Sequence, residues 1–241
     1  MTGPAMADST ITGPGGFAAD GIETWLFDLD NTLYPATCNL FDQIDQRMGH
    51  FIEARLRLTP VDARSLQKAL FREHGTTLRG LMDRHAVAPA EYLEFVHDID
   101  LSVVTASPEL ERALARLPGR KAIYTNASTA HAERVLARLG VIHHFAGVFD
   151  IAAAGYLPKP DPRSYAAAVA ALGLEPRRTV FFEDSARNLA PAHALGMTTV
   201  WVRPPADSLG AGFAAFEAKG DSIHHMTDDL VTWLEDAGRR G

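Results

Sequence analysis

The sequence WLFDLDNTLY at residues 25–34 decides the fold and the chemistry that we predict for this chain. It starts within a mostly apolar run, residues 22–27, which is typical of a short buried strand. Asp28 and Asp30 follow, and because strand side chains alternate, both are expected on one side where the strand ends. Two carboxylates this close repel unless a cation lies between them or one stays protonated, and a hard divalent metal meets that need. The spacing alone is also typical of a strand followed by an Asx turn, capped by Asp30 or Asn31.

Composition limits the class of protein. The chain has 241 residues, 46% hydrophobic and 22% charged, which indicates a soluble globular protein with one α/β domain and a small accessory domain. A formal charge of −7 argues against a nucleic acid polymer as partner, and no stretch is long and apolar enough to predict a membrane partner. The single cysteine, Cys38, excludes a disulfide within the chain and favours a reducing compartment, so we expect a cytoplasmic protein.

The distribution of patterns predicts two parts and a tail. Residues 1–20 are rich in small and polar residues without a signal pattern, and we expect a flexible tail. Residues 35–104 contain only helical patterns, which predicts a small all-helical cap inserted after the first strand. Strand and helix patterns alternate in the remainder, so residues 21–34 and 105–241 are predicted to form an α/β core. We expect a doubly wound, Rossmann-like, mostly parallel sheet.

Particular elements follow from the same patterns. Helices are expected at residues 39–58, 60–74, 78–85, 89–97, 129–139, 160–172 and 185–195, and a last one after Asp229. Strands are expected at residues 122–124, 147–150, 179–182 and 198–202, the last of these ending the sheet. Thr59 is a plausible N-cap of the second helix, with Pro60 at its first position.

Polar groups directly follow the predicted strands. The four groups are Asp28 with Asp30, Thr125 with Asn126, Lys159, and Glu183 with Asp184. Singly, each group has a simpler explanation, such as a helix cap, a solvated surface lysine or an acidic first helical turn. Because ligands of parallel sheets bind beyond the carboxyl ends of the strands, all four are expected in one site.

These residue types fit the hydrolysis of a phosphate monoester, whose two negative charges must be neutralised before an anion can attack. Asp28 can act as the nucleophile and form an acyl phosphate. Asp30 is placed to protonate the leaving oxygen and then to deprotonate the attacking water. Lys159 would neutralise phosphoryl charge, and Thr125 and Asn126 would hold phosphoryl oxygens.

The metal would be Mg²⁺, held by oxygen ligands. Asp28, Asp184 and the backbone carbonyl of Asp30 are the predicted ligands.

The same residues carry a resemblance to a known family. The segment from Asp28 to Thr32 resembles the first motif of the haloacid dehalogenase superfamily of phosphohydrolases. Thr125 is similar to the hydroxyl of the second motif, Lys159 to the lysine of the third, and Asp184 to the metal-binding acid of the fourth. Glu183 also falls within the fourth motif, and the resemblance implies that it assists the metal directly or through water. The resemblance covers residues 22–202 and implies an aspartyl-phosphate intermediate. The second aspartate, Asp30, favours a phosphatase over a dehalogenase, because a departing halide needs no proton.

Asn188 departs from the family pattern, since many relatives have a second aspartate at that place.

Within the superfamily, three segments resemble the pyrimidine 5′-nucleotidases. They are residues 33–35, 71–81 (FREHGTTLRGL) and 181–189 (FFEDSARNL). The resemblance implies a pyrimidine nucleoside 5′-monophosphate as substrate, under a mobile helical cap that excludes water. Among the residues predicted to bind substrate are then also Leu29, Tyr34, Thr76, Thr77 and Arg79. A capped helix start with a solvated arginine explains the last three equally well, and Tyr34 could instead pack at the hinge.

Two alternatives to a nucleotidase stay open. One is a phosphatase for another small metabolite, such as phosphoglycolate or a sugar phosphate; the other is a non-catalytic regulatory protein on the same scaffold. The oligomeric state is left open. The histidines show no metal-site spacing, and the neighbouring pairs at residues 143–144 and 224–225 are expected to point apart.

Overall fold

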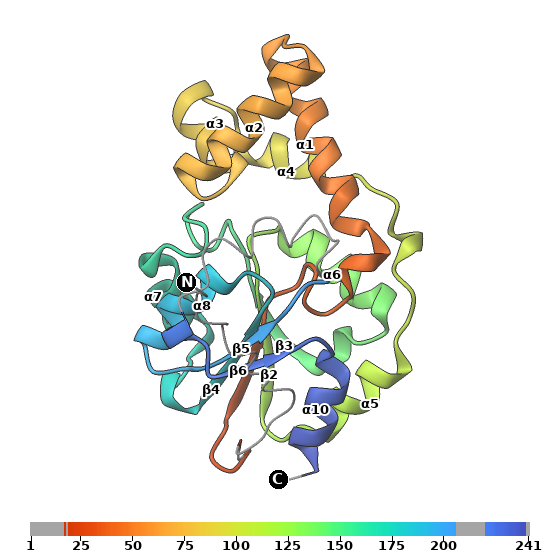
Figure 1. The fold of residues 1–241 in the computed structure, drawn as a ribbon, viewed down its shortest axis with the longest axis vertical. Coiled ribbons are helices and arrows are strands. Elements are labelled where there is room, and N and C mark those ends of the chain that lie inside the picture. Colours follow the sequence, from red (N-terminus) through yellow and green to blue (C-terminus); the bar gives the residue numbers. More distant parts are fainter. Residues whose placement is uncertain (1–16, 18, 206–219, 240–241) are drawn as a thin grey trace, which may run out of the picture.

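A parallel sheet lies at the centre of the structure, which is a computed structural model describing residues 17, 19–205 and 220–239. Within these residues six strands follow the order β3-β2-β1-β4-β5-β6, and every neighbouring pair is parallel (Figure 1). They are β1 (Thr24–Phe27), β2 (Arg120–Tyr124), β3 (Phe145–Phe149), β4 (Thr179–Glu183), β5 (Thr198–Val202) and β6 (His225–Thr227). The strand order reverses between β1 and β4, as in doubly wound folds, so the predicted fold class is confirmed.

The central strand β1 is buried along its whole length, which explains its apolar sequence. It pairs with β2 and β4 so that Phe27 lies opposite both Ile123 and Phe182. The residues that follow these strands therefore meet at one edge of the sheet. In such sheets ligands bind beyond the carboxyl ends of the strands at the point where the order reverses.

Helices cover both faces of the sheet (Figure 1). One face carries α5 (Pro108–Arg116), α6 (Thr129–Leu139) and α10 (Leu230–Gly238), and the other carries α7 (Pro162–Leu172) and α8 (Ala186–Ala194). Trp25 and Phe27 pack into the first layer and Leu26 into the second, as the period of two requires. The Phe27 ring stacks on Phe182 with ring centroids 4.7 Å apart. Burial of such a side chain contributes roughly 2–3 kcal/mol.

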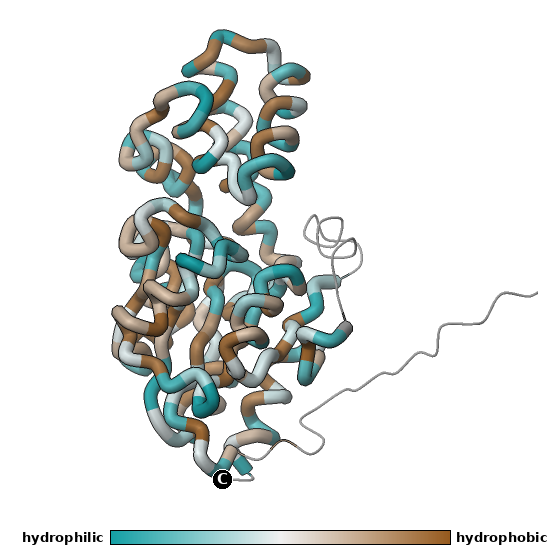
Figure 2. Tube along the Cα trace, turned by 90° about the vertical axis from the view of Figure 1, so that its left-hand side faces the viewer, coloured by the Kyte–Doolittle hydropathy of each residue, from teal (hydrophilic) through white to brown (hydrophobic). Residues whose placement is uncertain are grey.

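Four helices form a lobe beyond the carboxyl ends of the strands (Figure 1). They are α1 (Leu40–Leu56), α2 (Pro60–His74), α3 (Thr77–His85) and α4 (Pro89–Val96). The lobe has its own core, in which Phe51, Leu70 and Tyr92 are buried. In the tube view hydrophobic and hydrophilic segments alternate along these helices, as amphipathic helices require (Figure 2). The predicted helical cap after the first strand is confirmed, as is the Thr59 N-cap, which accepts a hydrogen bond from the Asp62 amide at 3.2 Å.

Several element predictions need correction. Helix α5 was not predicted, although Ser107 accepts a hydrogen bond from the Leu110 amide and a proline occupies the first helical position. Residues 198–202 do not end the sheet, because β6 pairs outside β5. Helix α7 begins at Pro162 and not at residue 160, since Asp161 is its N-cap.

Part of the predicted tail packs on the core. Phe17 is buried, and its ring lies 5.1 Å from the ring of Trp233, centroid to centroid. Residues 1–16 and 18 of that prediction lie outside the described residues. None of the helices in the parts that the structure describes is both long and apolar enough to cross a membrane.

Candidate active site

The Lys159 ammonium lies at the centre of the polar cluster. It donates hydrogen bonds to Asp28 Oδ1 at 2.6 Å, to Glu183 Oε2 at 2.7 Å and to the Tyr124 carbonyl at 3.0 Å. The lysine side chain is 1% exposed. Burial alone would lower the pKa of Lys159, but Asp28 and Glu183 outweigh it and raise that pKa, so the group stays charged. Residues from the ends of β1, β2 and β4 thus meet around the ammonium of Lys159. In the sequence, Lys159 and Asp28 are 131 residues apart.

The carboxylates around this cation exceed its charge. Asp28, Glu183 and Asp184 each bring an oxygen within 4.8 Å of the others. Burial and the neighbouring Glu183 raise the pKa of Asp28 to about 7, against the opposing effect of Lys159. Burial and the same glutamate raise the pKa of Asp184 well above its usual range. One ammonium therefore leaves negative charge uncompensated in a buried place.

This donor set fits a hard divalent cation such as Mg²⁺, which prefers carboxylate oxygens. A second observation agrees with it. Asn188 lines the same cavity, and its buried Oδ1 has no hydrogen-bond partner among the described residues. An unpaired buried acceptor is costly unless a ligand or ion satisfies it. Asp28, Glu183 and Asp184 would hold the ion, with the Asn188 oxygen close by.

Asp30 is held by two donors that bind the same oxygen. Its Oδ1 accepts a hydrogen bond from the Tyr34 hydroxyl at 2.6 Å and lies 3.0 Å from His131 Nε2. Burial would raise the pKa of Asp30, but His131 and Tyr34 outweigh it and lower that pKa. The Asp30 side chain is thereby oriented and kept ionised, and His131 Nε2 is the donor.

His131 and its neighbour His97 were not predicted as site residues from the sequence. The two rings stack with centroids 4.4 Å apart, and burial, followed by His131, lowers the pKa of His97 to about 3. His131 is 101 residues from Asp30 in the chain. One sequence signal could have identified His131. The residue lies in the first turn of α6, shortly after Thr125 at the end of β2, and a side chain at such a place can face the edge of the sheet.

The phosphate-binding residues predicted after β1 and β2 lie around the same edge. Thr125 is buried, and its Oγ1 accepts a hydrogen bond from the Ala127 amide at 3.0 Å. Asn126 Oδ1 accepts from the Lys159 amide at 2.9 Å, so its side chain positions the lysine loop. The Leu29 side chain is buried in the core, which leaves only its backbone available to a ligand.

A cavity of about 230 Å³ lies between this edge and the cap. Its lining includes Asp28, Asp30, Thr125, Asn126, Glu183 and Asp184 from the core. Thr76 and Thr77 line it from the cap, whereas Arg79 lines a second hollow and pairs with Asp83 at 2.9 Å. Thr76 Oγ1 is also the N-cap of α3, accepting from the Arg79 amide at 3.2 Å. The structure therefore brings the two threonines, but not the arginine, to the cavity beside Asp28.

One contact joins the cap to the metal-binding edge. Arg187, in the first turn of α8, donates a hydrogen bond to the Gly75 carbonyl at 3.1 Å. Its guanidinium lies 4.5 Å from the centroid of the Phe71 ring. The turn between α2 and α3 is thus tied to the helix that follows Asp184.

Asp28 with Asp30 beside it, a buried lysine and an acidic loop therefore lie at the reversal point of a doubly wound sheet, where α/β proteins bind their ligands. The sequence profile of the haloacid dehalogenase-like hydrolases matches residues 22–196, and the chain belongs to that family.

Individual proteins are similar to this chain in sequence, and solved structures are similar to it in fold. The chain is 28% identical over 187 residues to fructose-1-phosphate phosphatase YqaB of Escherichia coli, covering 74% of this chain and 95% of that protein. It is 25% identical over 191 residues to phosphate metabolism protein 8 of Saccharomyces cerevisiae, covering 73% of this chain and 60% of the yeast protein. The fold is similar to that of a phosphatase of the family from Thermococcus onnurineus (TM-score 0.59, 16% identity, covering 90% and 97%). It is also similar to L-2-haloacid dehalogenase from Xanthobacter autotrophicus (TM-score 0.53, 17% identity, covering 90% and 97%).

Proposed function

We propose that this chain is a Mg²⁺-dependent phosphomonoesterase that works through an aspartyl phosphate on Asp28. The observation that carries the proposal is the Lys159 ammonium hydrogen-bonded to both Asp28 and Glu183, with Asp184 beside them. A doubly negative phosphoryl group can approach Asp28 only where cations offset its charge. The two relatives named for phosphatase activity and phosphate metabolism support the same chemistry.

Each residue of the chain has a defined part in this reaction. Asp28 attacks phosphorus, the ester bond breaks, and the leaving oxygen takes a proton from Asp30. Lys159 stays protonated and offsets charge on the phosphoryl oxygens. Bound Mg²⁺ would supply further charge neutralisation at the same oxygens.

Asp30 must change its protonation state during the cycle. His131 and Tyr34 lower the pKa of Asp30, which suits the base that activates water for hydrolysis of the intermediate. A bound phosphate dianion raises the pKa of a neighbouring carboxyl group through like-charge repulsion, which favours the protonated acid before ester cleavage.

The proposed substrate is a pyrimidine nucleoside 5′-monophosphate. Apolar and aromatic side chains of the cap line the cavity, including Phe41, Ile44, Phe71, Leu78 and Tyr92. A flat base buries well against such a lining, whereas the hydroxyl groups of a sugar phosphate would need polar partners. Gln67, Thr76 and Thr77 also line it and carry groups able to hydrogen-bond a base edge or ribose.

A phosphatase for a sugar phosphate is the second candidate, because the relative from Escherichia coli is named for fructose 1-phosphate. A panel of phosphorylated metabolites, assayed with and without Mg²⁺, separates the two. We expect kcat/KM to be highest for UMP or CMP, and hydrolysis of an aryl phosphate to require Mg²⁺. A higher kcat/KM for fructose 1-phosphate or phosphoglycolate would overturn the nucleotidase proposal, and metal-independent or absent hydrolysis would overturn the phosphatase proposal.

The Phe71→Leu variant, assayed on the same panel, tests whether the cap recognises the base. It removes an aromatic surface from the cavity, together with the contact of the ring with Arg187, and changes no residue that hydrogen-bonds to Lys159. We expect kcat/KM for nucleotides to fall by about fivefold, from the loss of stacking worth about 1 kcal/mol, and to change little for phosphoglycolate. Equal losses for both substrates would contradict base recognition by this ring.

A further inference from the structure

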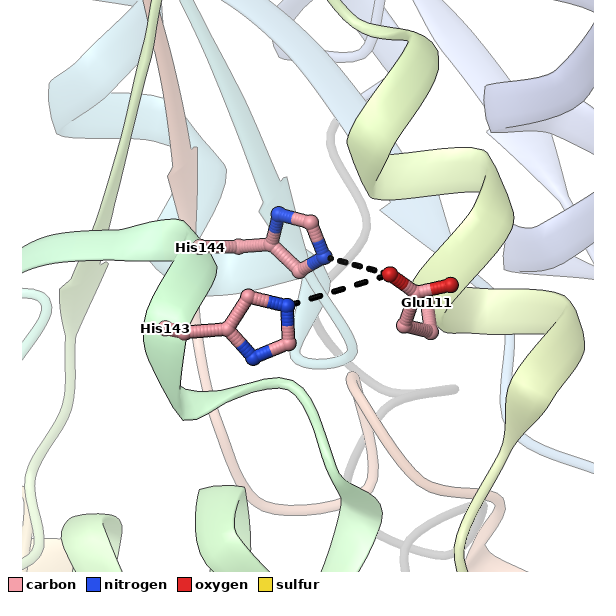
Figure 3. Close-up of side chains that lie close together, drawn as sticks. All are labelled: Glu111, His143 and His144. Carbon is pink, nitrogen blue, oxygen red and sulfur yellow. Dashed lines mark ion pairs between the residues drawn. The ribbon is translucent and has the colours of Figure 1, made fainter.

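A second group of metal-ligand residues lies at the other end of the core. Glu111 projects from α5, and His143 and His144 project from the short helix η3 (Ile142–His144) (Figure 3). Glu111 Oε1 is 3.4 Å from His144 Nε2 and 3.8 Å from His143 Nε2. The histidines were expected to point apart, but their rings lie with centroids 4.1 Å apart and both face the carboxylate. The 3₁₀ geometry of η3, which is neither strand nor α-helix, explains this difference.

The spacing of these atoms suits a tetrahedral transition-metal ion. Zinc bonds to histidine nitrogen and carboxylate oxygen measure about 2.0–2.2 Å, so neighbouring ligand atoms of a tetrahedron lie about 3.3–3.5 Å apart. The distance from Glu111 to His144 has this value, and that from Glu111 to His143 is a few tenths of an ångström longer. One ligand atom from each of the three residues lies within 4.8 Å of the others. Two histidines and a glutamate also form a recurring set of zinc ligands, completed by water.

The surroundings of His144 Nε2 suit a metal ligand. The Nε2 atom is buried and makes no hydrogen bond of good geometry within the described residues, although Glu111 Oε1 lies 3.4 Å away. A neutral imidazole offers a nitrogen lone pair to a metal ion. The His143 side chain is 60% exposed, which leaves an open path for an ion from solvent.

We propose that Glu111, His143 and His144 bind a divalent transition metal such as Zn²⁺. The site joins α5 to the segment before β3, at the amino end of that strand, whereas Asp28 follows the carboxyl end of β1. Strand geometry places the two ends about 13 Å apart over the length of β3. The metal links elements 32 residues apart in the chain and stabilises the core, while the phosphoryl chemistry takes place at the other end of the sheet.

Zinc titration in excess Mg²⁺ tests this site, because Mg²⁺ occupies oxygen-only ligands and leaves imidazole to zinc. Isothermal titration calorimetry should show one zinc ion per chain bound at the three residues. Cobalt substitution should give the visible absorption of a tetrahedral nitrogen and oxygen site. Zinc at about 100 times its Kd should raise Tm by on the order of 5 °C.

Variants at exposed positions keep the test independent of folding. Glu111→Gln and His143→Ala change side chains that are 39% and 60% exposed, and each should weaken zinc binding by about 100-fold and abolish the Tm shift. His50→Ala removes an exposed histidine from α1 and should bind zinc as the wild type does. Unchanged zinc affinity or an unchanged Tm shift in both cluster variants, with far-UV circular dichroism as in the wild type, would overturn the proposal.

Discussion

Replacement of Lys159 by methionine should destabilise the metal-free protein strongly, because methionine keeps the apolar stem and removes the ammonium. Asp28 and Glu183 then lose hydrogen bonds of 2.6 Å and 2.7 Å while their side chains stay 9% and 2% exposed. Removal of one partner from a buried ionic cluster costs about 3–5 kcal/mol. For a chain of this length that corresponds to a fall in Tm of roughly 6–20 °C. Turnover should also fall by about 10²–10³-fold, as for the loss of one group that stabilises transition-state charge.

Lys121→Met is the matched control for this experiment. Lys121 is also buried, but its ammonium donates only to the carbonyls of Leu117 at 2.5 Å and Gly119 at 3.3 Å among the contacts of the described residues. Its loss should cost about 1–3 kcal/mol. Thermal unfolding with a chelator and with Mg²⁺ then separates the two variants, because only Lys159→Met leaves carboxylates that a cation can pair. Two results would refute the proposed charge pairing at this site. One is that Lys159→Met is no less stable than Lys121→Met without metal. The other is that Mg²⁺ raises the Tm of Lys159→Met no more than that of Lys121→Met.

Three further outcomes are expected. Asp28→Asn should abolish turnover while far-UV circular dichroism stays unchanged, since an amide cannot form the acyl phosphate; measurable steady-state turnover would contradict the nucleophile assignment. Asp30→Asn should reduce kcat/KM most for esters with poor leaving groups, so equal losses for aryl and alkyl phosphates would argue against its role as acid. In metal-free protein the raised pKa of Asp28, about 7 against 3.8, means that its contribution to stability is full below about pH 4 and is lost as pH rises through 7. The free energy of unfolding of Asp28→Asn relative to the wild type should therefore increase between pH 4 and 7, by at most about 1.4 kcal/mol per pH unit, and a constant difference would refute this.

Local sequence signals were sufficient for the parts of the fold that depend on near neighbours. The apolar runs predicted β1 and β4 because both strands are buried on two faces. The Thr59 cap was predictable because its partner is three residues away. Strand β6 was missed because its three residues, His225, Met226 and Thr227, are too few to show an apolar pattern, and the pairing with β5 decides its conformation.

In the site, too, some residues could be predicted from the sequence and others could not. That Asp28, Lys159 and Glu183 would meet followed from their places after strands of one parallel sheet. The hydrogen bond from His131 to Asp30 did not follow, because it depends on the rotation of α6 against the sheet. The convergence of His143 on Glu111 depends likewise on how α5 packs, and α5 itself had been missed.

The position of β1 in the sheet has a consequence for biosynthesis. Both neighbours of this strand begin far downstream, at Arg120 and Thr179. As the chain leaves the ribosome, β1 emerges early with its backbone donors and acceptors on both edges unpaired, while the cap can already collapse on its local contacts. The loop that bears Asp28 should therefore acquire its final shape only after β4 has been translated, and nascent chains stopped before that strand are expected to leave the apolar β1 segment unpaired on that edge.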